Sequence, residues 1–231
     1  MSQTVQPFVT PGDMALCRRF AQDFLTHPTA FPISYTYDGN LYTGMPENTT
    51  VTRRFVDANI VETIMVGIVP PGLTLRVECQ SYRDYPAVEW TLYITADADT
   101  RLLENVLAID TIFKGTATLV HNNGDFCSAD GYMEGRTQLA PGVTFTQAPV
   151  GGRACDQAFP YQRLLFDTYG VNIAIGWPGQ WSCAYTGCAS GIRFTAGQEV
   201  VHTILKPGET LRTPRMSCVF FTGDEQRGIN M

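Results

Sequence analysis

The feature that most constrains this chain is a two-residue alternation of apolar and polar side chains along most of its length. In residues 73–79, Leu, Leu, Val and Cys alternate with Thr, Arg and Glu, and residues 88–94 repeat the pattern. Successive side chains of a β-strand point to opposite faces, so this spacing predicts strands with one buried face. Further strands are expected at 106–113, 115–121, 162–168, 171–177, 191–195, 198–205 and 215–222.

Turn-forming pairs such as Asn123-Gly124 and Pro207-Gly208 separate these runs. Such pairs supply the fixed or positive φ that tight β-turns require. Helical periodicity does not return between the strands, which argues against a βα barrel or a doubly wound sheet. The pattern therefore predicts an all-β fold, a large antiparallel β-sandwich of about a dozen strands.

One window near the N-terminus has helical spacing instead. In residues 13–25, large apolar side chains recur every four residues, and Asp13 can cap the start. Pro28 follows and ends the pattern. We therefore divide the chain into a short helix with its lead-in, residues 1–29, and a single β domain, residues 30–231.

Charge and hydropathy exclude two classes of partner. The net charge is −6 and no basic run exceeds two residues, so the chain lacks the Lys/Arg cluster that nucleic-acid binding needs. No apolar run approaches the roughly 20 residues that span a bilayer. The first ten residues carry no signal-peptide pattern, and the cellular location stays open because a signal can be removed.

The chain has seven cysteines, an odd number, and none forms a C-x-x-C pair. Several follow the strand alternation, which favours buried free thiols over a disulfide framework. Cys183 and Cys188 are the one pair that could bridge locally, and their bonding state stays open. With no histidine near them, a zinc site is not expected. We expect neither a metal ion nor a cofactor.

The strand ending in Trp177, Gln180 and Trp181 is the first candidate site, because flat rings beside an amide suit a sugar. A core strand with packed tryptophans explains the same residues equally well. The second candidate is the loop with Arg153 and Asp156. These two residues lie three positions apart and follow a pair of glycines. Loops of this kind often bind ligands on a rigid β scaffold. A structural ion pair is the alternative.

His121 and His202 both lie within or at the ends of expected strands. Sugar epimerisation needs an acid and a base that flank the sugar ring, and glycoside hydrolysis needs two facing carboxylates. Neither histidine has a spacing that forces it against a particular carboxylate, so a structural role is favoured for both.

Read together, several segments resemble the N-terminal domain of clan-D α-galactosidases of the family-36 melibiase type. The resemblance covers most of residues 30–231 and is most specific over 76–222. It rests on YRDYPAVEWTLYI (82–94), LLENVLAID (102–110), GGRACDQAFPY and VNIAIGWPGQW (within 151–181), and LKPGETLRTPRM (205–216).

The resemblance implies a β-supersandwich similar to galactose mutarotase, packed against a catalytic (β/α)8 barrel that carries two catalytic aspartates. The given sequence stops where the family would run on towards that barrel, so we expect no catalytic residue here. The matching positions imply a sugar-binding or barrel-facing surface. Cys155 and Gln157 differ from the family, which usually has small residues on either side of the aspartate that corresponds to Asp156. The candidate residues are Arg153, Asp156, Trp177, Gln180 and Trp181.

Three functions follow from these observations. The leading hypothesis is a non-catalytic accessory domain that shapes the active-site side of a (β/α)8 domain of the same parent chain. The alternatives are a stand-alone carbohydrate-binding module that takes galactosides on Trp177 and Trp181, and a mutarotase-like epimerase. Fold similarity alone is weak support for the epimerase.

Overall fold

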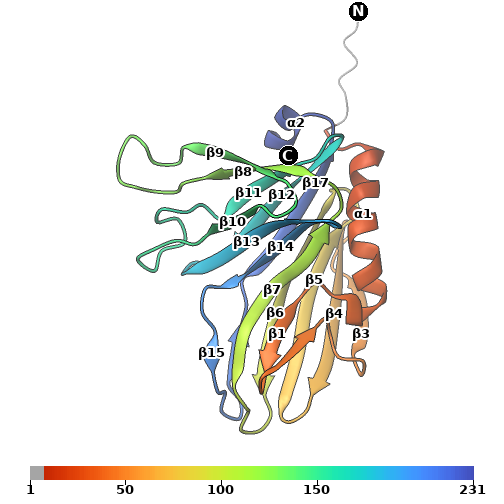
Figure 1. Ribbon diagram of the computed structural model, residues 1–231. Coiled ribbons are helices and arrows are strands. Elements are labelled where there is room, and N and C mark those ends of the chain that lie inside the picture. Colours follow the sequence, from red (N-terminus) through yellow and green to blue (C-terminus); the bar gives the residue numbers. More distant parts are fainter. Residues whose placement is uncertain (1–7) are drawn as a thin grey trace, which may run out of the picture.

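The computed structural model describes residues 8–231 and shows two antiparallel β-sheets packed into a sandwich (Figure 1). Residues 1–7 of the expected lead-in lie outside the described residues. The first sheet has seven strands. They are β1 (Ser34–Tyr37), β2 (Asn40–Thr43), β7 (Leu103–Phe113), β10 (Thr144–Gln147), β13 (Trp181–Cys188), β14 (Gly191–Gln198) and β15 (His202–Thr203).

The second sheet has ten strands. They are β3 (Thr50–Phe55), β4 (Ile60–Val69), β5 (Leu73–Tyr82), β6 (Ala87–Ala96), β8 (Ala117–Asn122), β9 (Glu134–Leu139), β11 (Tyr161–Leu165), β12 (Tyr169–Gly176), β16 (Thr210–Arg212) and β17 (Arg215–Thr222). The main order is β3-β4-β5-β6-β17-β12-β11-β8-β9, and in the first sheet it is β10-β13-β14-β7-β1-β2. The predicted all-β antiparallel fold is confirmed.

The strands predicted from alternation correspond to β5, β6, β7, β8, β11, β12, β14 and β17, with shifts at their ends. The expected strand at 198–205 is reduced to the two residues of β15. The alternation gives no prediction for the other eight strands, which are β1, β2, β3, β4, β9, β10, β13 and β16. All six residues of β3 are exposed, so this edge strand has no buried face to produce an alternation.

The core lies between the sheets and consists of the inward side chains of the alternating strands. On β5 and β6, Leu75, Val77, Trp90 and Leu92 have no exposed surface. The indole Nε1 of Trp90 donates a hydrogen bond across the sandwich to the carbonyl of Ala108, at 2.8 Å. Burial of these side chains supplies the main stabilisation of the fold.

Helix α1 (Pro11–Thr26) closes one open side of the sandwich (Figure 1). Its buried Phe24 packs edge-on against Trp90 at 5.8 Å between ring centroids, and Phe20 lies 5.0 Å from Phe220. The predicted helix is confirmed, but its N-cap is Thr10 rather than Asp13. Asp13 lies three residues further on, where its carboxylate accepts the Thr10 backbone N–H and completes a capping box. The division at residues 29 and 30 stays a prediction.

Asp13 also links the two ends of the described chain. Its fully buried carboxylate accepts the Thr222 backbone N–H at 2.7 Å and the Thr222 hydroxyl at 2.8 Å. Arg227, on the short helix α2 (Glu225–Ile229), donates from Nη1 to the same oxygen at 2.8 Å. The ion pair of Asp13 with Arg227, together with the bonds to Thr222, therefore joins α1, β17 and α2.

A small polar cluster bridges the sheets inside the core. Gln162 of β11 accepts the Tyr185 hydroxyl at 2.7 Å and donates to the Gln147 side-chain oxygen at 2.8 Å. Gln162 is nearly fully buried and Tyr185 has no exposed surface. Burial raises the pKa of the Tyr185 hydroxyl well above its ordinary value, so it remains a donor. The cluster fixes how the two sheets face each other here.

Replacing Tyr185 by phenylalanine is expected to lower the free energy of unfolding by about 1–2 kcal/mol, because the buried Gln162 oxygen loses its main donor. Tyr161→Phe is the matched control, since the Tyr161 side chain is exposed, and it should change little. Urea unfolding of the two variants makes the comparison. Equal stability of both would contradict a stabilising role for the cluster.

All seven cysteines are free. Cys183 and Cys188 sit at two positions of the same strand, β13, with Cys183 buried and Cys188 at the strand end. Residues 8–231 contain no helix that is both long enough and apolar enough to cross a membrane.

Candidate functional site

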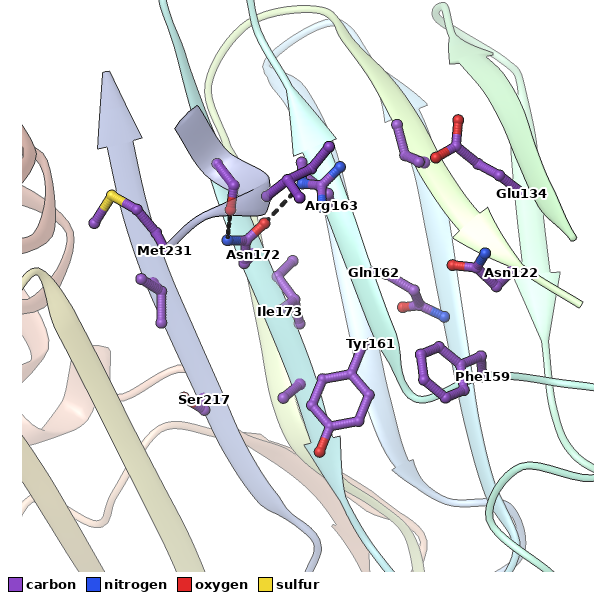
Figure 2. Close-up of a pocket in the computed structure, with 15 residues that line it drawn as sticks. Asn122, Glu134, Phe159, Tyr161, Gln162, Arg163, Asn172, Ile173, Ser217 and Met231 are labelled. Atoms are coloured by element: carbon purple, nitrogen blue, oxygen red, sulfur yellow. Dashed lines mark hydrogen bonds between the residues drawn. The ribbon is translucent and has the colours of Figure 1, made fainter. Parts of the chain in front are cut away.

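A groove of about 440 Å³ lies on the outer face of the ten-stranded sheet, beside α2 (Figure 2). Strands β8, β11, β12 and β17 are neighbours in this sheet and form the floor of the groove. In each strand, every second side chain points away from the core and towards the groove. Most of the lining is apolar. It includes Val120, Phe159, Tyr161, Ala174, Val219 and Ile229.

Aromatic rings form a row at one end of the groove. Tyr132 and Phe159 lie 5.4 Å apart between centroids, and Phe159 and Tyr161 lie 5.3 Å apart. Phe159 and Tyr161 stand side by side over the sheet (Figure 2). Tyr161 is 60% exposed and Tyr132 is 48% exposed. The rings are tilted or perpendicular to one another, so they do not form a flat stacking surface.

Paired charges lie at the other end of the groove. Arg163 donates to Asn172 at 2.8 Å and to Glu225 at 3.0 Å, and Glu225 also accepts from Arg136 at 2.8 Å. Asn172 in turn donates to the Gly228 carbonyl at 2.8 Å. These contacts fasten α2 to the sheet and leave each of these charged groups with a partner.

Trp181 has no exposed surface, and its ring belongs to the core. Its Nε1 donates a hydrogen bond to the Ala154 carbonyl at 2.8 Å. Trp177 is partly buried and packs against the core, with the Arg212 guanidinium 5.9 Å from its ring centre. The two tryptophans therefore do not form a shared platform on the surface, and Trp181 instead anchors the loop that contains Ala154.

The five residues singled out in the sequence belong to two segments that the structure brings together. Gln180 accepts the Gly152 backbone N–H through its side-chain oxygen at 3.0 Å. Arg153 binds Asp156 at 2.9 Å and lies 4.0 Å from Asp125. A sugar-binding or barrel-facing role for these residues stays a prediction.

The backbone of this loop explains its glycines. Gly151 has φ of 69°, in the left-handed region that favours glycine. A Cβ at this position would lie 2.7 Å from a carboxylate oxygen of Asp156. Glycine therefore lets the loop close tightly over the aspartate.

His121 and His202, the two histidines expected on strands, lie in different sheets. His121 of β8 packs against Phe145 at 4.2 Å between ring centres, and burial lowers its pKa. His202 of β15 pairs with Glu104 at 2.8 Å on an exposed surface. The imidazoles do not converge on one site, and no group of three or more His, Cys, Asp and Glu within residues 8–231 is arranged to hold a metal ion.

The sequence alone does not predict the groove. Phe159 and Tyr161 follow a loop without a motif, and α2 has too few residues to show helical periodicity. One available signal was the alternation in β11, which places Tyr161 and Arg163 on the face opposite the buried Gln162 and Leu164.

No family model matches the chain. A search of curated proteins also finds no match. Solved structures do match. An α-galactosidase from Lactobacillus brevis superposes with a TM-score of 0.69 at 13% identity, over 85% of this chain and 30% of that protein. The GH36 α-galactosidase AgaA from Geobacillus stearothermophilus gives 0.63 at 14% identity, over 83% of this chain and 30% of its own.

A third match, the galactosidase domain of the α-galactosidase-sucrose kinase AgaSK, has a TM-score of 0.67 at 14% identity. It too covers 83% of this chain and 30% of the matched protein. The chain thus spans about a third of the length of the structures that it matches. The comparisons show the fold: this chain has the β-supersandwich architecture found in one part of the α-galactosidases of family GH36.

Proposed function

We propose that the chain is a non-catalytic accessory domain of an α-galactosidase-like glycoside hydrolase, and that it packs against a catalytic (β/α)8 domain of the same parent protein. One observation carries the proposal. Between 83% and 85% of the chain superposes on α-galactosidases, yet the match accounts for only 30% of each of those chains. A unit of this fold is therefore one part of a larger enzyme in the proteins it resembles.

The geometry of the carboxylates supports a non-catalytic role. Asp125 and Asp156 come together through an isolated β-bridge, but Arg153 lies against both of them. A glycosidase site needs two carboxyl groups that face each other across the scissile bond, whereas both of these carboxylates are engaged with Arg153 in a cluster of ion pairs within the loop.

In this role, the loops that carry Arg153, Asp156, Trp177 and Gln180 border the contact with the catalytic domain. Trp181 supports them from the core through its bond to Ala154. The burial of Trp181 also disfavours the stand-alone carbohydrate-binding module, which needs both tryptophans on the surface.

The isolated chain is expected to show no hydrolysis of p-nitrophenyl α-galactoside above the background rate. The assay should include a known GH36 α-galactosidase, such as AgaA, as the positive control. The Asp156→Asn variant, purified in the same way, controls for contaminating hydrolase. Turnover by the original chain that disappears in this variant would contradict the proposal.

A further inference from the structure

We infer that the groove beside α2 is the surface on which the catalytic domain docks. The inference rests on the proposed function and adds to it the location of the contact. It places the centre of the contact at Phe159, Tyr161 and Ile229, on the outer face of the ten-stranded sheet.

Large apolar side chains at the groove are exposed to solvent. Tyr161 and Ile229 both line the groove and are 60% and 53% exposed, and Tyr132, which packs against the lining residue Phe159, is 48% exposed. Monomeric proteins rarely leave a contiguous apolar patch beside a concavity without a partner. Aromatic side chains in pockets are also the residues that contribute most to binding between proteins.

The charged side chains at the groove are already paired with one another. Arg163 and Arg136 both bind Glu225, and Arg136 also binds Glu134 at 2.7 Å. Each of these four side chains already has a partner of opposite charge. A protein surface that binds here therefore does not have to supply a counter-charge for them. The groove therefore fits an apolar, uncharged protein surface better than an anionic or a cationic ligand.

The share of the matched enzymes that this fold occupies identifies the occupant. The superposed region is 30% of each matched α-galactosidase, so most of each of those proteins lies outside this fold and can cover its apolar surface. Other strongly exposed apolar residues, such as Leu41 and Val200, do not line this groove.

Hydroxyl-radical footprinting tests the location. The chain of residues 1–231 and the protein expressed from its complete natural gene, which we expect to be longer, would be labelled under identical conditions. Tyr161 and Ile229 should be labelled in the shorter chain and lose their labelling in the longer one. Leu41 is the internal control, because it is 71% exposed and lies on β2 of the other sheet, and its labelling should not change.

The outcomes separate a failure of the docking site from a failure of the proposed function. If the longer protein contains a catalytic domain but Tyr161 and Ile229 stay labelled, the groove is not the contact and the proposed function stands. If the natural protein has no further domain, both claims fail. A Tyr161→Asp variant adds a second readout. It should leave the melting temperature of residues 1–231 nearly unchanged and lower that of the longer protein, whereas Leu41→Asp should affect neither.

Discussion

Replacing Asp13 by alanine is expected to lower the free energy of unfolding by about 3–5 kcal/mol, which is the usual cost of removing one partner from a buried ion pair. The substitution leaves the Thr222 N–H without its acceptor and Arg227 without its counter-ion. It also removes half of the capping box of α1. Because α1, β17 and α2 all meet at this carboxylate, the loss affects the closure of the sandwich, and urea unfolding would measure it.

The same carboxylate gives stability a defined dependence on pH. Burial alone would raise the pKa of Asp13, but hydrogen bonds from Arg227, Thr10 and Thr222 outweigh it and hold the pKa far below its ordinary value. A group with a lowered folded-state pKa stabilises the fold fully above its unfolded pKa, about 4 for aspartate, and loses this contribution as the pH falls. The wild-type chain should therefore lose stability in acid more steeply than Asp13→Ala.

Asp23→Ala is the matched control on the same helix. Asp23 is exposed and pairs only with His27, so its loss should change the free energy of unfolding by about 0.5 kcal/mol or less. If Asp13→Ala were as stable as Asp23→Ala at neutral pH, the buried pair would not be what joins the helices to the sheet.

Replacing Trp181 by alanine is the second large effect, with an expected loss of about 3–5 kcal/mol. The indole has no exposed surface, and its removal leaves a cavity in the core at the start of β13. The Ala154 carbonyl also loses its donor, so the loop that contains Arg153 and Asp156 should become more mobile. Thermal unfolding and hydrogen exchange of this loop would measure the two consequences.

Trp177→Ala serves as the comparison within the same motif. Trp177 is only partly buried, and the expected loss is about 1–2 kcal/mol. A sugar platform predicts the opposite pattern, in which both variants fold normally and both lose galactoside binding. Titration calorimetry of the two variants separates these possibilities.

The sequence predicts those parts of the fold in which a strand has one buried and one solvated face. β5 and β6 alternate over much of their length, so the sequence predicts both, and the four-residue spacing of apolar side chains predicts α1. β3 has no buried face, and β4 and β13 are broken by Gly67 and by small residues such as Gly187, so their patterns are weak. The pairing of distant strands, such as β12 with β17, depends on tertiary packing that no local pattern records.

The candidate site was predictable only in part. The sequence places Trp177 and Trp181 near each other but does not show which face of the chain each ring occupies. Trp181 begins β13, where Cys183 and Tyr185 share its inward face, so strand register decides its burial. The groove depends on α2 folding back over β12, a contact made through Asn172 and Gly228. Neither residue carries a sequence signal for it.

The central claim is that this supersandwich is one part of a larger hydrolase. The most direct measurement is the length and sequence of the natural protein, read from its gene past Met231 and checked by intact mass. We predict that the frame continues into repeated strand–helix units of a (β/α)8 domain with two carboxylates at the carboxyl ends of its strands. A natural protein that ends at or close to Met231 would contradict the account.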